Sequence, residues 1–570
     1  MTAAPASGAA DLDHGKDPTM TPKPTRAPAG GTPLRLIALG GMGEIGKNCY
    51  LYEYGDELLL VDAGLAFPDE ATPGVDIIIP DTSYLAGRAH QLRGILITHA
   101  HEDHIGALVH LLPELPGVPV YASTLARALI ESKLKGAKAG QHALRTLNPG
   151  DRLTLGAFTV EPFRIGHSIP DAQGFALHTP VGTVIHTGDF KFDRTPIDGR
   201  GTDFELLKRF GADGVLALVS DSTRAESPGH TPSEAVVGET FREVIGSRKG
   251  RIIVATFASN IARLQQVISA AEGANRRVAV VGRSMEQNAK IAQGIEYLKL
   301  KAPLLAGGDI AAHTGSPLVI ATTGAQGEPM AGLAKMGRGE HRNVKIEAGD
   351  TVIVSASPIP GNEEAVGRTI DDLFRAGADV IYHSIAKVHV SGHASADELR
   401  EMVALTRPRH MVPMHGEFRM QVAHGRLAVE AGVDPSRVHI AENGFPIEFH
   451  PDGSVRRPKP VAHGRRLIVH GSSHPLDESL LTERLRLAAE GIVVVAIGSN
   501  GASPVVLSRG FLDAEQERRL LPGAAAAAAQ VLKEPGLSAE RRAERVAAVV
   551  AGYLARETGR RPQVMPLTVA

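Results

Sequence analysis

The chain has 570 residues, of which 43% are hydrophobic and 22% are charged, a balance typical of folded proteins. This length predicts two to four domains. The 61 basic and 63 acidic residues nearly cancel, which excludes a generally cationic nucleic-acid-binding coat, so any polyanion must bind in a local groove. The single cysteine, Cys49, excludes an internal disulfide framework and a thiolate-rich zinc site.

The sequence predicts neither a membrane-spanning nor a secretory segment. No stretch approaches the roughly 20 consecutive apolar residues that span a bilayer, and the first residues contain no apolar secretory core. We therefore expect a cytoplasmic protein with no membrane contact. Residues 1–33 are rich in Ala, Gly, Pro and Thr without hydrophobic periodicity, and we expect them to be a disordered tail.

The first ordered part, over 34–222, mixes strand-like and helical patterns. Short apolar runs that end in glycine, aspartate or histidine predict strands, and residues 123–136 predict a helix between two of them. Such alternation favours stacked α/β layers over an all-α or all-β fold. The predicted strands lie at 34–39, 57–62, 94–98, 157–165 and 181–188.

Residues 223–386 have a more regular pattern, typical of a parallel sheet with crossover helices. Its predicted strands lie at 251–255, 277–281, 318–321 and 351–355. Residues 387–450 follow, and 451–465 read as a turn and a linker. The remaining 466–570 predict a compact α+β domain. Its strands are expected near 466–470, 491–497, 504–508 and 562–568, and its helices near 513–533 and 538–557.

The most informative segment is Thr98-His-Ala-His-Glu-Asp-His-Ile-Gly106, directly after a predicted buried strand. His99 and His101 lie two apart, so both can point the same way as the strand ends. Asp103 and His104 start a helix, which turns them towards a second position nearby. One ion is too few for this many donors, and the pattern predicts two metal ions side by side.

This segment resembles the second motif of the metallo-β-lactamase superfamily, and the other motifs follow in order. Asp62, in Val-Asp-Ala-Gly64, matches the first motif, an aspartate that supports the ligands from behind. His167, in Gly-His-Ser168, matches the third. Asp189, in His-Thr-Gly-Asp189, matches the fourth, where some members use a thiolate. A carboxylate that bridges two hard cations favours a binuclear hydrolytic site.

The last ligand comes after a long interval, which resembles the inserted domain of the β-CASP group of nucleases. The best candidate is His415, in Pro-Met-His415-Gly-Glu417, which lies 226 positions after Asp189 (415 − 189). The further motifs of that group match Asp221, in Ser-Asp221-Ser-Thr223, and His393, in His389-Val-Ser-Gly-His393-Ala-Ser395. The superfamily resemblance covers about 34 to 450.

Within that group the chain most resembles the bacterial ribonuclease J family. The resemblance implies an α/β fold: a metallo-β-lactamase αββα sandwich (34–222 and 387–450), an inserted β-CASP domain (223–386) and a C-terminal α+β domain (466–570) that supports oligomerisation. It is carried by the 389–395 run and by the segments 40–48, 257–261, 282–285, 322–328 and 357–362.

The resemblance also implies the roles of the site residues. His393 is the general acid that protonates the leaving 3′ oxygen, Asp221 orients its ring, and Asp103 serves both metal binding and catalysis. The cofactor is two divalent ions per subunit, Zn²⁺ in first place and Mn²⁺ as alternative or activator. The implied ligands are His99, His101 and His167 for the first ion, Asp103, His104 and His415 for the second, and Asp189 as the bridge.

The implied partner is single-stranded RNA with a 5′ monophosphate, cut from the 5′ end and internally. A homodimer or tetramer and other RNA-degradation proteins are further implied partners. We expect the terminal phosphate near a loop of small residues, Ser391, Gly392, His393, Ala394 and Ser395. Ser259, Asn260, Arg263 and Arg283 are candidates for lining the RNA path, and packing explains each of these four equally well.

Three alternatives compete with this interpretation. A DNA nuclease is compatible, because no residue identifies a reader of the 2′-hydroxyl. A small-molecule thioester or lactam hydrolase leaves the insertion unexplained, and a non-catalytic scaffold predicts lost ligands, of which there are none.

Separately, Gly41-Met-Gly-Glu-Ile-Gly46 matches a dinucleotide-binding fingerprint. Because 47–51 predicts extended chain instead of a helix, we expect a tight loop at the mouth of the site.

Overall fold

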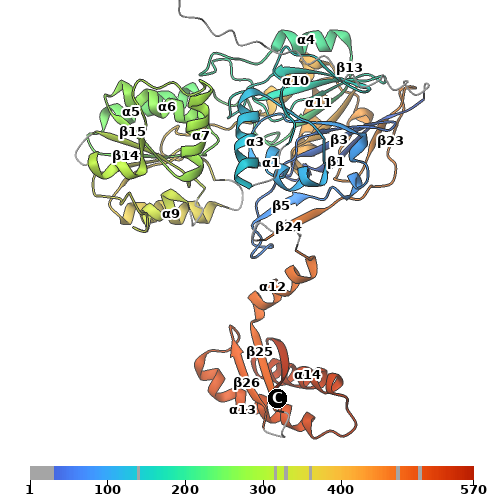
Figure 1. Ribbon diagram of the computed structural model, residues 1–570, viewed down its shortest axis with the longest axis vertical. Helices are drawn as coiled ribbons and strands as arrows, with labels where there is room; N and C mark the ends of the chain where they lie inside the picture. Colours follow the sequence, from blue (N-terminus) through green and yellow to red (C-terminus); the bar gives the residue numbers. More distant parts are fainter. Residues whose placement is uncertain are drawn as a thin grey trace, which may run out of the picture.

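The computed structural model describes residues 31–137, 142–313, 317–326, 331–358, 362–469, 476–498 and 503–569. Most of the predicted tail, 1–30, therefore lies outside the described residues. Figure 1 shows two adjoining α/β bodies, one carrying α1, α3 and β1 and the other β14, β15 and α5 to α7. A smaller body with β25, β26, α13 and α14 follows at the end of helix α12.

The first body contains two facing sheets. The eight-stranded sheet has the order β23-β22-β1-β3-β4-β6-β7-β8, and the six-stranded sheet has the order β20-β13-β12-β11-β10-β9. Their strands are β1 (Leu34–Gly40), β3 (Cys49–Tyr54), β4 (Glu57–Val61), β6 (Leu92–Leu96), β7 (Val120–Ala122), β8 (Leu144–Thr146), β9 (Leu153–Leu155), β10 (Phe158–Arg164), β11 (Gln173–His178), β12 (Thr183–His186), β13 (Val215–Asp221), β20 (His410–Met414), β22 (Ile447–Phe449) and β23 (Val455–Arg456).

Helices cover the outer face of each sheet. Helices α1 (Glu102–Ile105), α2 (Leu108–Leu111) and α3 (Thr124–Ala137) share a buried apolar cluster with the first sheet. Helices α4 (Phe204–Asp213), α10 (Ala396–Thr406) and α11 (Phe418–Glu430) share another with the second sheet. A third cluster, which includes Tyr50, Phe158 and Val412, fills the space between the sheets. This is the predicted αββα sandwich.

The second body is a six-stranded, all-parallel sheet with the order β16-β15-β17-β14-β18-β19. Apolar clusters cover both faces of the sheet, and its central strands β17, β14 and β18 are buried along their whole length. The strands are β14 (Ile252–Ala255), β15 (Arg277–Val281), β16 (Leu305–Ala306), β17 (Leu318–Thr322), β18 (Thr351–Val354) and β19 (Asp379–Ile381). The helices are α5 (Ala235–Ser247), α6 (Ile261–Gly273), α7 (Arg283–Gly294), α8 (Gly332–Gly337) and α9 (Glu363–Arg375).

The third body packs two helices on one three-stranded sheet of order β26-β25-β27. Its strands are β25 (Ile492–Gly498), β26 (Val505–Arg509) and β27 (Gln563–Val569), and its helices are α13 (Ala514–Leu532) and α14 (Ala539–Thr558). The predicted α+β pattern of this region is confirmed. No helix among the described residues combines the length and apolarity needed to cross a membrane.

The strand predicted near 466–470 forms, but it belongs to the first body and not to the C-terminal domain. It is β24 (Arg465–Ile468), and it pairs antiparallel with β5 (Ile77–Pro80) of the first body. Leu467 packs there against Ile78 and against Leu481 of α12 (Glu478–Glu490). The assignment of β24 to the C-terminal domain was wrong because a strand pattern predicts extended chain but does not name the strand with which it pairs.

Candidate metal centre

The histidine-rich segment follows β6 as the sequence predicted. β6 ends at Leu96, Thr98 and His99 continue the chain, and the short helix α1 begins at Glu102. Gly64 allows this close packing, because a Cβ there would stand 1.6 Å from the carbonyl oxygen of Asp103. His99 and His104 are buried, while the side chain of Asp103 stays partly exposed.

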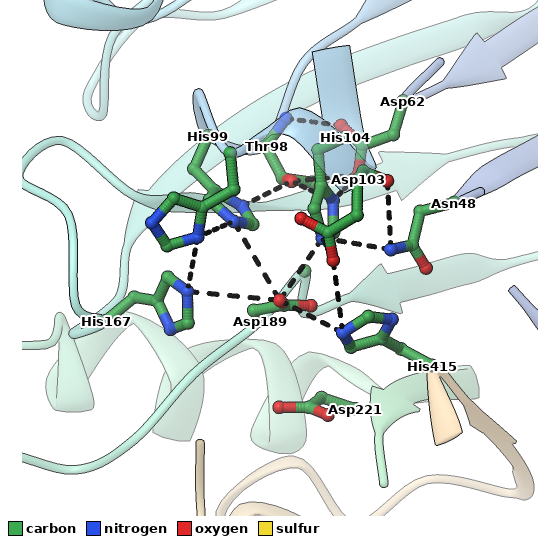
Figure 2. A network of polar contacts seen from close by, with 12 residues as sticks. Asn48, Asp62, Thr98, His99, Asp103, His104, His167, Asp189, Asp221 and His415 are labelled. Carbon is green, nitrogen blue, oxygen red and sulfur yellow. Dashed lines mark hydrogen bonds and ion pairs between the residues drawn. The ribbon is translucent and has the colours of Figure 1, made fainter. Parts of the chain in front are cut away.

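Three imidazoles form the first group of donors. His101 Nδ1 lies 3.0 Å from His99 Nε2 and 3.1 Å from His167 Nε2. The rings of His99 and His167 lie beside each other, with centroids 4.7 Å apart (Figure 2). His167 comes from the loop after β10, so the structure joins residues that are 66 positions apart.

The second group contains Asp103, His104, Asp189 and His415, one donor atom of each lying within 4.8 Å of the others. Asp189 Oδ2 is central: it lies 3.2 Å from His104 Nε2 and 3.2 Å from His415 Nε2. The same oxygen lies 3.8 Å from His99 Nε2 and 3.9 Å from His167 Nε2. It therefore faces both groups of donors (Figure 2).

The donors fit divalent metal ions. A tetrahedral ion with metal–nitrogen distances of about 2.0–2.1 Å places its ligand atoms roughly 3.3 Å apart, close to the spacing of the three imidazole nitrogens. In the second group, Asp189 Oδ1 and His415 Nδ1 are buried without a hydrogen-bond partner among the described residues. Six nitrogen and oxygen donors around one shared carboxylate are able to bind divalent ions.

Asp62 fixes one ligand from behind. Its carboxylate Oδ2 accepts a hydrogen bond from His104 Nδ1 at 2.7 Å, and both oxygens accept bonds from Thr98 at 2.8 Å. This bond to Nδ1 turns His104 Nε2 towards the site. Burial lowers the pKa of His104, but the charges of Asp189, Asp103 and Asp62 outweigh burial and raise that pKa, so a metal ion at Nε2 would displace a proton. Asp62 has a φ of 63° and His415 a φ of 47°, the left-handed region, so backbone strain accompanies this placement.

Two backbone carbonyls hold further parts of the site. His167 Nδ1 donates to the carbonyl of Gly392 at 2.7 Å, which leaves Nε2 facing His101. The backbone N–H of His415 donates to Gly41 at 2.8 Å. The Gly41–Gly46 motif is thus a loop beside the last ligand, and residues 49–54 form β3 instead of a helix, as predicted. A helix N-terminus for dinucleotide binding is absent at this motif.

The electrostatics keep the first group neutral. Burial, together with His104 and the other rings, lowers the pKa of His99 well below its usual range. Burial also lowers the pKa of His167 and brings that of His101 to about 4. At neutral pH these imidazoles therefore have free lone pairs, which is the form that binds a metal ion.

His393 and Asp221 form a hydrogen-bonded pair beside the donors, within 4.8 Å of donor atoms of Asp189 and His415. His393 Nδ1 donates to Asp221 Oδ2 at 2.8 Å, and Nδ1 lies 3.9 Å from Asp189 Oδ2. Asp221 Oδ1 accepts bonds from the N–H and hydroxyl of Thr223 at 2.9 and 2.7 Å. Burial lowers the pKa of His393, but the charge of Asp221 and its hydrogen bond raise it to about 9.

Asn48 and Thr98 are functional neighbours to which sequence reasoning assigned no role. Asn48 Nδ2 lies 3.0 Å from His104 Nε2 and 3.1 Å from the carbonyl oxygen of Asp103. Its Oδ1 accepts from the Tyr50 hydroxyl at 2.9 Å, which fixes the orientation of the amide. The sequence could have indicated this role, because Asn48 directly precedes a fully buried strand, where a polar side chain needs a hydrogen-bond partner.

The predicted RNA-path residues separate into two kinds. Arg263 is completely buried: it bonds to Glu234 Oε2 at 2.6 Å and to Ser355 Oγ at 2.7 Å. Asn260 is buried as well and caps α6 by accepting from the Arg263 N–H. Their placement on the RNA path was wrong, because both satisfy buried polar groups. Ser259 is partly exposed and Arg283 is exposed.

The loop around His393 is packed more tightly than expected. Gly392, Ala394 and Ser395 are buried, and Ser391 is partly exposed. Ser395 starts α10 in a capping box with Glu398, and its hydroxyl lies 2.9 Å from Thr231 Oγ1. The Ser395 side chain therefore serves helix capping, which corrects its assignment as a phosphate contact.

Four family models match consecutive parts of the chain. The metallo-beta-lactamase superfamily matches residues 42–249, and the ribonuclease J beta-CASP domain matches 249–373. The Zn-dependent metallo-hydrolase RNA specificity domain matches 377–440, and the ribonuclease J C-terminal domain matches 479–570. These matches agree in order with the three bodies of the fold.

Ribonuclease J of Thermus thermophilus is 41% identical over 549 residues, which cover 94% of this chain and 95% of that protein. The chain belongs to the ribonuclease J family. Ribonuclease J of Mycolicibacterium smegmatis is 39% identical, covering 96% of this chain and 99% of that protein. Ribonuclease J2 of Bacillus subtilis is 38% identical, covering 86% of this chain and 89% of that protein.

A solved structure of an Enterococcus faecalis protein of unknown function shares the fold, with a TM-score of 0.50 and 15% identity over 73% of this chain and 100% of that one. Membership of the ribonuclease J family confirms the predicted metal-dependent nuclease class and its domain types. The thioester- or lactam-hydrolase alternative is accordingly excluded.

Proposed function

We propose that this ribonuclease J family chain hydrolyses phosphodiester bonds of single-stranded RNA, in RNA processing and decay. Cleavage proceeds 5′→3′ from a 5′-monophosphorylated end and also internally. The observation that carries the proposal is the convergence of six metal-binding side chains on a seventh, Asp189, with the His393–Asp221 pair at their edge.

We assign one ion to His99, His101 and His167 and a second to Asp103, His104 and His415, with Asp189 shared. Nitrogen and oxygen donors without thiolate accept zinc, our first choice, or manganese as alternative or activator. When bound, a pair of ions lowers the pKa of a shared water and neutralises charge that develops at phosphorus.

His393 acts as the general acid. Its Nδ1 proton is held by Asp221, so Nε2–H is the proton available to the leaving 3′ oxygen. Because the pKa of His393 is raised to about 9, the ring carries this proton at neutral pH. Asp221 both orients the ring and stabilises its charged form.

The 5′ phosphate binds near the 391–395 loop. The N–H of His393 donates to Ser391 Oγ at 3.1 Å and that of Ser395 to Glu398 Oε2 at 2.8 Å, so neither is free for the phosphate. The loop N–H groups left for it are those of Ser391, Gly392 and Ala394. The RNA-binding assignment of this loop thus rests on its backbone.

We further propose that the third body joins two chains into a homodimer, with a tetramer as the larger alternative. The face of its sheet that points away from α13 and α14 is aliphatic: Val494 of β25 lies between Leu507 and Met565, and Ala496 lies between Val505 and Leu567. The side chains of Val505, Leu507, Met565 and Leu567 are 42–56% exposed, and Val569 is 51% exposed. A contiguous apolar face of this kind marks a protein interface. A cytoplasmic location and contacts with other RNA-degradation proteins stay predictions.

The proposal is tested by incubating the purified protein with 5′-monophosphorylated RNA, 5′-triphosphorylated RNA and matched DNA, with zinc and manganese in separate reactions. Release of mononucleotides from the monophosphorylated RNA, together with slower internal cleavage of the triphosphorylated RNA, is the expected result. Equal or faster cutting of DNA contradicts the substrate assignment, and no cutting of any substrate contradicts the proposal as a whole.

A further inference from the structure

A groove leads away from His167 along the seam between the first and second bodies. Arg164, Pro170, Asp171, Ile197 and Arg200 line it from the first body, and Glu234 and Ala262 line it from the second. The groove begins at a residue of the first donor group. A strand that reaches the donors along this seam passes these side chains.

The outer charged groups of the groove are already paired. Arg200 Nη1 donates to Asp171 Oδ1 at 3.3 Å, and Arg200 Nε donates to Asp198 Oδ2 at 3.1 Å. Its guanidinium also lies 4.7 Å from the ring centre of Tyr297, whose hydroxyl donates to Asp171. This cluster joins the two bodies, and its acidic partners already neutralise the charge of Arg200.

The inner charged groups are paired as well. Glu234 binds the buried Arg263 and lies 3.5 Å from Lys191 Nζ. Asp193 accepts bonds from the backbone N–H groups of Thr195 and Glu234 at 2.9 and 3.0 Å. Glu234 and Asp193 are therefore already engaged, and the neighbouring cations Lys191 and Arg263 both pair with Glu234.

Arg164 is the exception among the groove's charged residues. No carboxylate of the described chain lies within 4.0 Å of its guanidinium nitrogens, and its side chain is partly exposed. Its backbone is fixed at the end of β10, since Arg164 N donates to Asp203 Oδ2 at 2.7 Å and its carbonyl accepts from the Asp203 N–H at 3.0 Å. Among the described residues, the Arg164 side chain therefore has no ion-pair partner. It lies at the end of β10, three residues before His167.

The groove beside Arg164 also offers apolar surface. The partly exposed Pro170 lies on the His167 side, and Ile197 is 39% exposed. A nucleotide has the matching pair of features, a charged phosphate and a flat base or sugar that packs on aliphatic groups. We infer that Arg164 binds a backbone phosphate of the RNA strand in this groove, next to the donor group that holds His167. This inference rests on the proposed ribonuclease function.

The test compares Arg164→Gln with wild type on single-stranded, 5′-monophosphorylated RNA at several salt concentrations. Loss of one phosphate contact should raise KM roughly tenfold, as expected for a charge-assisted hydrogen bond. It should also lower the slope of log KM against log salt by about 0.7, the value for one phosphate contact on a single strand. Metal content and kcat should stay within twofold of wild type.

Three further variants separate the outcomes. Arg152→Gln, which removes a 66% exposed arginine beside Glu161 in the middle of β10, should change neither KM nor the slope. Arg164→Lys should retain the wild-type slope. Ile197→Glu places a carboxylate on the exposed wall and should also raise KM, which tests the groove even if Arg164→Gln fails to fold. If wild type cleaves RNA but Arg164→Gln and Ile197→Glu match its KM and slope, this inference is wrong and the proposed function stands. A wild type that does not cleave RNA contradicts the proposed function instead.

Discussion

His393 Nδ1 and Asp221 Oδ2 lie 2.8 Å apart although 172 positions separate the two residues in the chain. Asp221 is the last residue of β13, and His393 lies in the loop before α10. The pair lies at the edge of the donor groups. In the proposed mechanism, His393 Nε2 is the nitrogen that donates its proton to the leaving oxygen. This relationship makes the pH dependence of the reaction a direct probe of the site.

Asp221→Asn should shift the alkaline limb of the kcat–pH profile to lower pH. The pKa of His393 is raised to about 9, so the wild-type acid is protonated below that pH, and activity falls as pH rises through it. Removing the charge of Asp221 lowers the pKa, so the fall begins earlier. The measurement is kcat on 5′-monophosphorylated RNA from roughly pH 7 to pH 11, about two units on either side of the expected wild-type midpoint.

Asp213→Asn is the matched control, because Asp213 is an exposed aspartate at the end of α4. Its profile should coincide with wild type. An unchanged alkaline limb in Asp221→Asn would remove Asp221 from its proposed role.

Gly392→Ala should displace His167. A Cβ at Gly392 would stand 2.7 Å from His167 Cε1 and 2.8 Å from its Nδ1, and the Gly392 carbonyl is the acceptor that orients this ring. We expect the bound metal, measured by elemental analysis after gel filtration, to fall from two ions per chain towards one. Gly367→Ala, in α9 with open space around the Cβ, should keep both ions and add up to about 1 kcal/mol of stability.

Asp62→Asn should weaken metal binding without unfolding the protein. The amide cannot accept the His104 proton as strongly as the carboxylate does, so His104 Nε2 becomes a poorer and less well oriented donor. Loss of such a supporting group costs about 10- to 100-fold in metal affinity. Competition with a chelator measures the change, and the exposed Asp56→Asn is the control. Equal affinities for both variants would contradict the assignment.

Arg263 and Arg283 should differ in what their loss affects. Arg263→Met removes the nearer of the two cations that pair with the buried Glu234, leaving only Lys191 at 3.5 Å, and should destabilise the second body by about 3 kcal/mol. Arg283→Met removes an exposed side chain and should change stability by no more than about 0.5 kcal/mol. Urea denaturation followed by circular dichroism compares them. Similar midpoints would show that the Arg263 network is dispensable.

Leu507→Lys should convert the proposed homodimer to monomer. The substitution places a charge in the middle of the aliphatic sheet face, opposite Val494. Light scattering after gel filtration should give half the wild-type mass, while Arg518→Glu on the exposed side of α13 should leave the mass unchanged. A wild type that is already monomeric contradicts the dimer.

The comparison of sequence and structure shows which features a sequence can predict. The spacing of His99 and His101 after a buried strand fixes their local geometry, so the first donors were predictable from a few residues. His415 was placed only by resemblance, because no local pattern reveals that β20 returns beside β13. Arg263 was misplaced since a buried, ion-paired arginine has the same local sequence pattern as one on a binding surface. The partner of β24 was missed because a strand pattern does not show which strand it pairs with.

The most direct test of the paired-ion site is anomalous diffraction from crystals of the protein loaded with zinc or with manganese. The account predicts two peaks, one among His99, His101 and His167, the other among Asp103, His104 and His415, with Asp189 between them. A single peak, peaks away from these residues, or no peak in protein that cleaves RNA would contradict it.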